Sequence, residues 1–280
     1  MPKADLHVHS SVSDGCHSPE EIVRMAAGLG IETLAIADHD NIGGIARAIA
    51  AARQFPNLRL IPNVEISTYL TEGEAHILGY FINYQDEKLQ KKLTQFGNSR
   101  VTRAEGMVAK LATMGVNLPF PRVLEIAGEG SVGRPHIAAA MMEKGYITHM
   151  AEAFDRYIGN GGPAYVERDK LTPAAAVELI CEAGGLPGLA HPTTVRNIEG
   201  LVRELKMAGL VAIEAYYKDY STPQVQELLN IANHYKLIPT GGTDYHGNDP
   251  NEIMMGDVYI PPQSISQLFA LAEARGLALD

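Results

Sequence analysis

The sequence predicts an α/β protein built on a parallel sheet or a barrel, with a block of helices inserted into it. Three observations lead to this class. Short apolar segments alternate with amphipathic helical segments in both outer parts of the 280-residue chain. Its middle part, residues 86–165, carries helical patterns only. Histidine and acidic residues recur where the apolar segments end, and active sites of β/α barrels lie at such strand ends.

The first part of the chain follows a strand–helix rhythm. The opening Ser18-Pro19-Glu20-Glu21 of the first helix places Ser at the N-cap, Pro at the first helical position and Glu at the third. Gly30 ends that helix. We expect strands at 3–8, 33–37, 58–68 and 75–82, and helices at 18–29 and 42–54.

The middle part of the chain is predicted to be helical, whereas the last part again alternates strands and helices. Helices are expected at 87–115, 121–127, 135–144 and 149–157, followed by the Gly-rich loop 159–163. The rhythm then resumes, with helices at 172–183, 197–207, 222–235 and 264–275 and strands at 186–190, 210–214, 237–239 and 257–260. The sequence therefore predicts one α/β domain, residues 1–85 and 166–280, with a helical insertion, residues 86–165.

Composition narrows the classes of partner. The net charge of −10 argues against binding of duplex nucleic acid through a broad positively charged surface. A phosphorylated substrate stays open, because bound divalent cations reverse the local sign. No apolar stretch reaches the length that spans a bilayer, the start shows no secretory signal, and Cys16 and Cys181 are the only cysteines. We expect a cytoplasmic protein without a membrane partner.

The first forty residues contain a candidate metal-binding site. His7 and His9 are two apart on a short strand, so their side chains point to the same face and can hold one ion. Asp14 follows in the next loop, and His39 comes just after the second apolar run. The plainer alternative, ordinary polar residues at strand ends, becomes hard to sustain for the whole set. For Asp40 a helix cap is the plainer interpretation.

Further candidate ligands lie at or near the ends of later strands. Glu65 is near the end of the expected strand 58–68, His76 opens the next strand, and His191, Asp244 and His246 come just after strand ends. Histidine and carboxylate ligands without cysteine suit Zn²⁺, Mn²⁺ or Fe²⁺. The number of ligands exceeds what one ion needs, so we expect a cluster of two or three ions, which suits phosphoryl displacement by a metal-bridging hydroxide.

A second candidate site lies inside the insertion. Ser131, Arg134 and His136 open the helix expected there, and a helix N-terminus beside an Arg and a His can bind phosphate. A plain helix cap with a structural arginine is the alternative. Arg168, just after the Gly-rich loop, is a further candidate phosphate ligand.

At this point the sequence resembles the PHP family, the polymerase-and-histidinol-phosphatase metal-dependent phosphoesterases. The resemblance rests on four motifs: Asp5-Leu-His7-Val-His9-Ser; Ala37-Asp38-His39-Asp40 with Glu65 downstream; Gly188-Leu-Ala-His191-Pro192; and Gly242-Thr-Asp244-Tyr-His246. It implies a distorted (β/α)7 barrel with three metal positions at the carboxyl ends of the strands.

The resemblance also implies how the ligands are shared. The first ion would take His7, His9, Glu65 and Asp244; the second Glu65, His76 and His191; the third Asp14, His39 and His246. Mn²⁺ is favoured, with Fe²⁺ or Zn²⁺ as alternatives. Some members of the family have His where this chain has Asp14, which leaves open the occupancy of the third position and the preferred metal.

Residues 132–136 and 161–166 resemble a bacterial subgroup of 3′,5′-nucleotide bisphosphate phosphatases and 5′→3′ exoribonucleases that act on short RNA. That likeness implies a nucleoside 3′,5′-bisphosphate, or the 5′ end of a short single-stranded RNA, as substrate. Ser131, Arg134, His136 and Arg168 would bind its phosphates, Arg134 would stabilise the transition state, and His136 or His246 would protonate the leaving group. The alternatives are a phosphatase for a small metabolite such as histidinol phosphate, a non-catalytic metal-binding accessory module of a polymerase, and an amidohydrolase.

Overall fold

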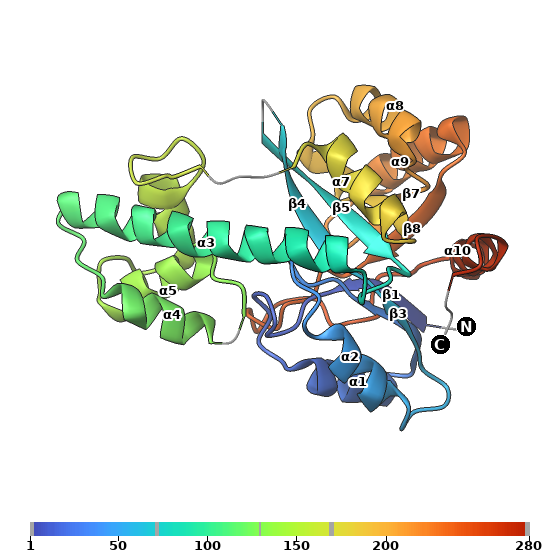
Figure 1. The fold of residues 1–280 in the computed structure, drawn as a ribbon, viewed down its shortest axis with the longest axis horizontal. Coiled ribbons are helices and arrows are strands. Elements are labelled where there is room, and N and C mark those ends of the chain that lie inside the picture. Colours follow the sequence, from blue (N-terminus) through green and yellow to red (C-terminus); the bar gives the residue numbers. More distant parts are fainter. Residues whose placement is uncertain (1–2, 71–72, 129, 168–170, 278–280) are drawn as a thin grey trace.

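The computed structural model describes residues 3–70, 73–128, 130–167 and 171–277 and has a mixed α/β architecture with a helical lobe on one side (Figure 1). Three parallel strands form the first sheet, in the order β1 (Lys3–Val8), β2 (Ile31–Ile36), β3 (Arg59–Pro62). The alternation of strands and helices predicted this parallel pairing.

Five strands form the second sheet. Their order is β4 (Glu65–Leu70), β5 (Gly73–Tyr80), β6 (Leu186–Ala190), β7 (Ala212–Tyr217), β8 (Ile238–Gly242). The strand β5 runs antiparallel to both of its neighbours, whereas β6, β7 and β8 are parallel to one another. The antiparallel β5 brings its first half to the end of the sheet where β6 and β8 finish.

Backbone hydrogen bonds connect the two sheets at both edges. On one side, the amide of Asp244 donates to the carbonyl of His7 (2.8 Å), and that of His9 donates to Tyr245 (2.9 Å). On the other, the amide of Asp40 donates to the carbonyl of Glu65 (2.8 Å). Residues from opposite ends of the chain therefore lie side by side at one end of the strands.

Helices cover the outer faces of the sheets. They are α1 (Pro19–Gly28), α2 (Ile45–Ala52), α7 (Pro173–Glu182), α8 (Ile198–Ala208), α9 (Thr222–Tyr235) and α10 (Pro262–Ala274), with a 3₁₀ turn η2 (Pro192–Thr194) after β6. The capping box predicted at Ser18 and Glu21 is present at the start of α1. Of the helices in the described residues, none has the length and hydropathy to cross a membrane.

Residues 87–158 form the helical lobe. It consists of α3 (Glu87–Thr113), α4 (Phe120–Ala127), α5 (Arg134–Glu143), α6 (Met150–Ala153) and a π-helical turn η1 (Phe154–Ile158). The helix α3 runs from the sheet out into the lobe (Figure 1). Buried Met107, Leu111, Ile137 and Met141 belong to an apolar core of its own, distinct from the cores around the sheets.

Two expected strands differ from the structure. The segment 58–68 is two strands, because the side chain of Asn63 accepts a hydrogen bond from the amide of Val64 (2.9 Å) and the chain then passes from one sheet to the other. Residues 257–260 form no strand. There, Gly256 has φ +78° and Pro261 lacks an amide donor, so regular pairing does not extend.

Candidate metal centre

Every predicted metal ligand lies at the end of the strands where the two sheets meet. His7 is in β1 and His9 directly follows it; both imidazoles are fully buried. His191 and Asp244 follow β6 and β8, and both have positive φ, +25° and +50°. Residues held in such strained backbone conformations are concentrated at functional sites.

Glu65 lies at the centre of the group and is fully buried. Its Oε2 atom is 2.9 Å from His39 Nδ1, 3.3 Å from His9 Nε2 and 3.4 Å from His7 Nε2. One carboxylate oxygen therefore faces three imidazoles that come from two strand ends.

The other oxygen of Glu65 faces a second group. Oε1 is 2.9 Å from His76 Nδ1 and 3.0 Å from His191 Nε2. A carboxylate whose two oxygens face separate sets of imidazoles has the arrangement of a bridge between two ions. This is the role that the family resemblance implies for Glu65.

Two further carboxylates complete the group. Asp244 Oδ1 is 3.0 Å from His9 Nε2 and 3.4 Å from His7 Nε2. Asp14 Oδ1 is 3.4 Å from His246 Nε2, and its Oδ2 is 3.8 Å from His39 Nε2. Three overlapping sets of potential ligands result: His9–Asp14–His39–His246, His7–His9–Glu65 and His39–Glu65–His76.

The polar atoms of this group fit a metal better than they fit one another. Several are buried without a geometrically adequate hydrogen bond: Nε2 of His7, both ring nitrogens of His9, Nδ1 of His39 and His191, Oδ1 of Asp14 and Oε2 of Glu65. Buried polar atoms normally find partners. Lone pairs that converge on common points without bonding one another are what divalent cations require.

The electrostatics point the same way. Burial alone would raise the pKa of the Glu65 carboxyl, but the surrounding histidines outweigh burial and hold it well below its usual range. Burial alone would lower the pKa of His9 and His76, but the nearby carboxylates raise these values to about 10 and about 9. Without metal, protons on His9 and His76 balance the buried carboxylates, whereas burial lowers the pKa of His39. Metal ions would replace the protons on His9 and His76.

Sequence reasoning missed residues behind the ligands. Glu214, in β7, lies 3.0 Å from His7 Nδ1, and the Tyr217 hydroxyl donates to Asp244 Oδ2 (2.7 Å). The expected strand 210–214 ended at Glu214, so the strand-end rule pointed to it. Nothing in the sequence distinguished Tyr217.

Asp40 does not cap a helix, which corrects the sequence interpretation. Its Oδ1 accepts from the amide of Ser67 (2.9 Å), and its Oδ2 accepts from Arg100 of α3. The helix α2 begins five residues later, at Ile45, and its N-cap is Gly44. The carboxylate instead connects the sheet to the helical lobe.

The group of candidate ligands opens into a cavity of about 160 Å³ under the lobe. Its lining combines residues of the centre with residues of α3 and α5: Ser13, Asp14, His39, Ser67, Glu74, His76, Arg100, Arg103, Ser131, Gly133, Arg134, Pro135 and Phe154. Three arginines in one small cavity beside the ligands make it suited to an anion.

The predicted phosphate-binding residues take different places. Ser131 and Arg134 line this cavity, and Arg134 donates to Asn160 (2.8 Å). His136 Nδ1 accepts from the amide of Gly133 (2.9 Å), so its ring proton is on Nε2, and burial lowers its pKa. Arg168 lies outside the described residues.

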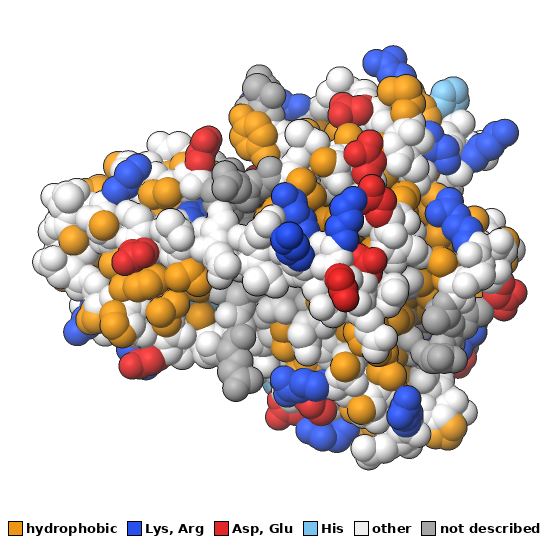
Figure 2. Space-filling view, viewed as in Figure 1, with side chains coloured by type: hydrophobic (Ala, Val, Ile, Leu, Met, Phe, Trp, Pro, Cys, Tyr) orange, Lys and Arg blue, Asp and Glu red, His pale blue; other side chains and the backbone are white. Residues whose placement is uncertain are grey.

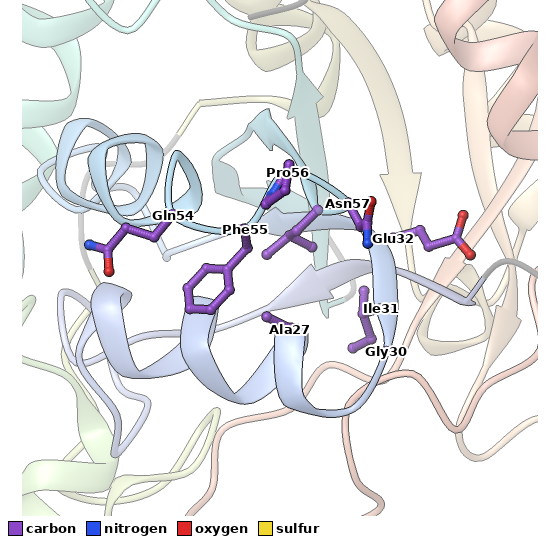
Figure 3. A pocket seen from close by; sticks show the side chains of 9 residues that line it. Ala27, Gly30, Ile31, Glu32, Gln54, Phe55, Pro56 and Asn57 are labelled. Atoms are coloured by element: carbon purple, nitrogen blue, oxygen red, sulfur yellow. The ribbon is translucent and has the colours of Figure 1, made fainter.

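A larger hollow lies elsewhere and lacks this chemistry. It measures about 540 Å³ and is lined by the end of α1, the start of β2 and the loop between α2 and β3, with Ala27, Ile31, Phe55 and Pro56 around it (Figure 3). Glu32 is its one ionisable lining residue. The donor set and the strained backbone therefore identify the smaller cavity as the candidate site.

Comparison with known proteins shows the family to which the chain belongs. Residues 5–239 match the PHP domain family, and the chain belongs to this family. It is 33% identical over 248 residues to a 5′-3′ exoribonuclease of Haemophilus influenzae, covering 87% of this chain and 90% of the relative. It is 30% identical over 251 residues to a 3′,5′-nucleoside bisphosphate phosphatase of Chromobacterium violaceum, covering 88% of each.

Solved structures share the whole fold. One from Bifidobacterium adolescentis, described as a candidate metal-dependent phosphoesterase, has a TM-score of 0.88 at 25% identity and covers 99% of this chain and 98% of that one. Another, described as an amidohydrolase from Chromobacterium violaceum with bound sulfate, has a TM-score of 0.87 at 29% identity over 98% of this chain and 96% of that one.

Proposed function

We propose that this protein is a metal-dependent phosphoesterase that hydrolyses nucleoside 3′,5′-bisphosphates or the 5′ end of short oligoribonucleotides. The observation that carries the proposal is the position of Glu65, whose two oxygens face five imidazoles at the mouth of an arginine-lined cavity. The names of the two similar proteins, an exoribonuclease and a bisphosphate phosphatase, support the same substrate class.

The proposed cofactor is a cluster of two or three divalent ions, with Mn²⁺ favoured over Fe²⁺ and Zn²⁺. His7, His9, Glu65 and Asp244 would hold the first, Glu65, His76 and His191 the second, and Asp14, His39 and His246 the third. When bound, the ions would supply an activated hydroxide and neutralise charge on the phosphoryl oxygens.

The chain's own residues would orient the substrate. Arg134 and Ser131 line the cavity and would bind a phosphate; Arg168 is proposed to do the same. Between the two candidate general acids, His136 is favoured. Both ring nitrogens of His246 are engaged, Nδ1 with the carbonyl of Asp244 (2.9 Å) and Nε2 with Asp14. In His136 the ring proton is on Nε2, and this proton would be donated to the leaving oxygen.

The finer architecture belongs to the same proposal. The two sheets would together form the distorted (β/α)7 barrel, residues 1–85 and 166–280, and the insertion 86–165 would cap it.

Acidic and basic side chains of the described residues intermingle on the face in Figure 2, which supports a substrate bound in a cavity rather than duplex nucleic acid on a basic surface. A cytoplasmic location and the absence of a membrane partner stay predictions.

Phosphate release tests the proposal. With added Mn²⁺, the protein should release phosphate from adenosine 3′,5′-bisphosphate, or cleave a short 5′-phosphorylated RNA, faster than it hydrolyses histidinol phosphate. The Glu65→Gln variant should lose this activity by about 100-fold or more, because it removes the negative charge and replaces one of the two facing oxygens with an amide nitrogen. Preference for histidinol phosphate would favour the metabolite phosphatase. Bound metal without activity on any phosphate ester would indicate an accessory module, and hydrolysis of amides alone an amidohydrolase.

A further inference from the structure

Glu214 is a buried carboxylate that contacts two predicted metal ligands at once. It lies in β7 and is fully buried. Its Oε1 atom is 3.0 Å from His7 Nδ1, and its Oε2 atom accepts a hydrogen bond from the backbone amide of His191 (2.7 Å). Within the described residues no lysine or arginine forms an ion pair with it. Burying a carboxylate is costly, so packing alone does not account for this position.

The contact with His7 determines which ring nitrogen is free. An imidazole that donates its Nδ1 proton to a carboxylate keeps the lone pair on Nε2. In His7, Nε2 is the atom 3.4 Å from both Glu65 Oε2 and Asp244 Oδ1. Glu214 therefore presents the correct nitrogen of His7 to the first metal position.

The contact with His191 holds a strained main chain. His191 has φ +25° and ψ +58°, a left-handed conformation uncommon for a residue with a side chain. Its amide donates to Glu214 while its Nε2 lies 3.0 Å from Glu65 Oε1. Fixing the amide fixes the direction in which the imidazole leaves the chain toward the second metal position.

The strand β7 is irregular at this point. Glu214 pairs with Thr240 of β8, but the register shifts before Tyr216, which pairs with Gly241. Irregularities of this kind re-aim side chains next to active sites. Although β7 supplies no predicted ligand, it reaches the centre through Glu214 and through Tyr217.

We propose that Glu214 is a positioning residue that sets the tautomer of His7 and the backbone of His191, and so preorganises the first and second metal positions together. The inference rests on the proposed function only in that both require a metal centre. In this role one carboxylate, Glu214, couples His7 and His191, two predicted ligands from strands that are far apart in the sequence.

The Glu214→Gln variant tests the coupling because its shape is almost unchanged. Both oxygens of Glu214 accept, whereas glutamine offers one acceptor and one donor, so either orientation disrupts one of the two contacts. Titration of Mn²⁺ into the metal-stripped full chain by calorimetry should show affinity lowered about 10- to 100-fold, while circular dichroism confirms that the variant is folded.

Tyr80→Phe is the matched control. Tyr80 is also fully buried, and its hydroxyl donates to Thr240 Oγ1 (3.3 Å), the β8 neighbour of Glu214, without touching a predicted ligand. It should keep the Mn²⁺ affinity of the wild type. Unchanged affinity in Glu214→Gln, or an equal loss in Tyr80→Phe, would overturn the inference.

A second measurement needs no substitution. In zinc-loaded wild-type protein, nitrogen-15 NMR of the histidine rings should show His7 with a proton on Nδ1 and zinc on Nε2; zinc on Nδ1 would overturn the inference. Metal binding without phosphoesterase activity would overturn the proposed function alone, because the role of Glu214 is read from binding. A wild-type chain that binds neither Mn²⁺ nor Zn²⁺ would overturn both.

Discussion

Arg100 of helix α3, in the helical lobe, forms an ion pair with Asp40, which follows β2. Its Nε is 3.1 Å and its Nη2 2.5 Å from Asp40 Oδ2, and Nη2 also donates to the Ser67 hydroxyl (3.2 Å). The two side chains are only 11% and 1% exposed. Because His39 directly precedes Asp40, this pair fixes the lobe next to a predicted metal ligand.

Arg100→Ala should therefore destabilise the fold and loosen the lobe. Removing one partner of a buried ion pair costs about 3–5 kcal/mol, since the remaining charge stays buried. Chemical denaturation measures the loss. Arg122 of α4, whose pair with Glu143 is about half exposed on both sides, is the control, and Arg122→Ala should leave stability nearly unchanged. If Arg100→Ala lowered the free energy of unfolding no more than Arg122→Ala does, the Arg100–Asp40 pair would not stabilise the fold.

Gly242 determines how closely β8 approaches β1. A Cβ at this position would lie 2.4 Å from the Cβ of His7 and 2.6 Å from its backbone nitrogen. Gly242→Ala should cost about 1–3 kcal/mol by overpacking and displace His7, so that Mn²⁺ binding weakens in calorimetric titration.

The control for that substitution is Gly97→Ala in the middle of α3, where a Cβ would meet nothing within 4 Å. This change should stabilise the protein by up to about 1 kcal/mol, because alanine favours a helix interior. Wild-type metal affinity in Gly242→Ala would contradict the assignment of His7 to the centre.

The stability of the metal-free protein should fall as the solution becomes alkaline. The carboxylates raise the pKa of His9 to about 10 and of His76 to about 9, both from an ordinary value of 6.5. A raised folded-state pKa contributes stability that is complete below the unfolded value and is lost as pH rises through the folded value. Denaturation in EDTA should therefore show declining stability from about pH 6.5 to about pH 10.

Saturating Mn²⁺ should remove most of that decline, because the metal would replace the protons on His9 and His76. The lowered pKa values of Glu65 and Asp244 act with the opposite sign. Their contribution is present above the unfolded values and is lost as pH falls through the folded ones. A metal-free stability that stays flat up to pH 10 would contradict the charge balance inferred for the centre.

Arg134→Ala should impair catalysis more than folding. Its guanidinium lines the cavity, and a charge-assisted hydrogen bond to phosphate is worth about 1.5–3 kcal/mol. We expect kcat/KM for adenosine 3′,5′-bisphosphate to fall about 10- to 100-fold. Arg156→Ala, in the same lobe but more than half exposed and paired with Glu152, should retain wild-type kinetics. Equal kinetics in both variants would exclude Arg134 from substrate binding.

Periodicity and turn chemistry predicted most elements because these signals are local. The capping box at Ser18 and Glu21 and the strand 186–190 lie where the sequence placed them. The single strand predicted over 58–68 was wrong, since both halves are apolar and only a side-chain hydrogen bond of Asn63 separates them. The barrel itself stays a prediction, because the described strands form two sheets.

The sequence by itself predicted which side chains lie together: two-residue spacing and strand ends indicated His7, His9, Asp244 and the other candidate ligands, because the strand period and the chain direction fix where such side chains emerge. Only the tertiary structure decided what supports them. Glu214 and Arg100 act through contacts with residues distant in sequence, His7 and Asp40. No local pattern encodes such contacts, because they exist only after the sheets and the insertion have packed together.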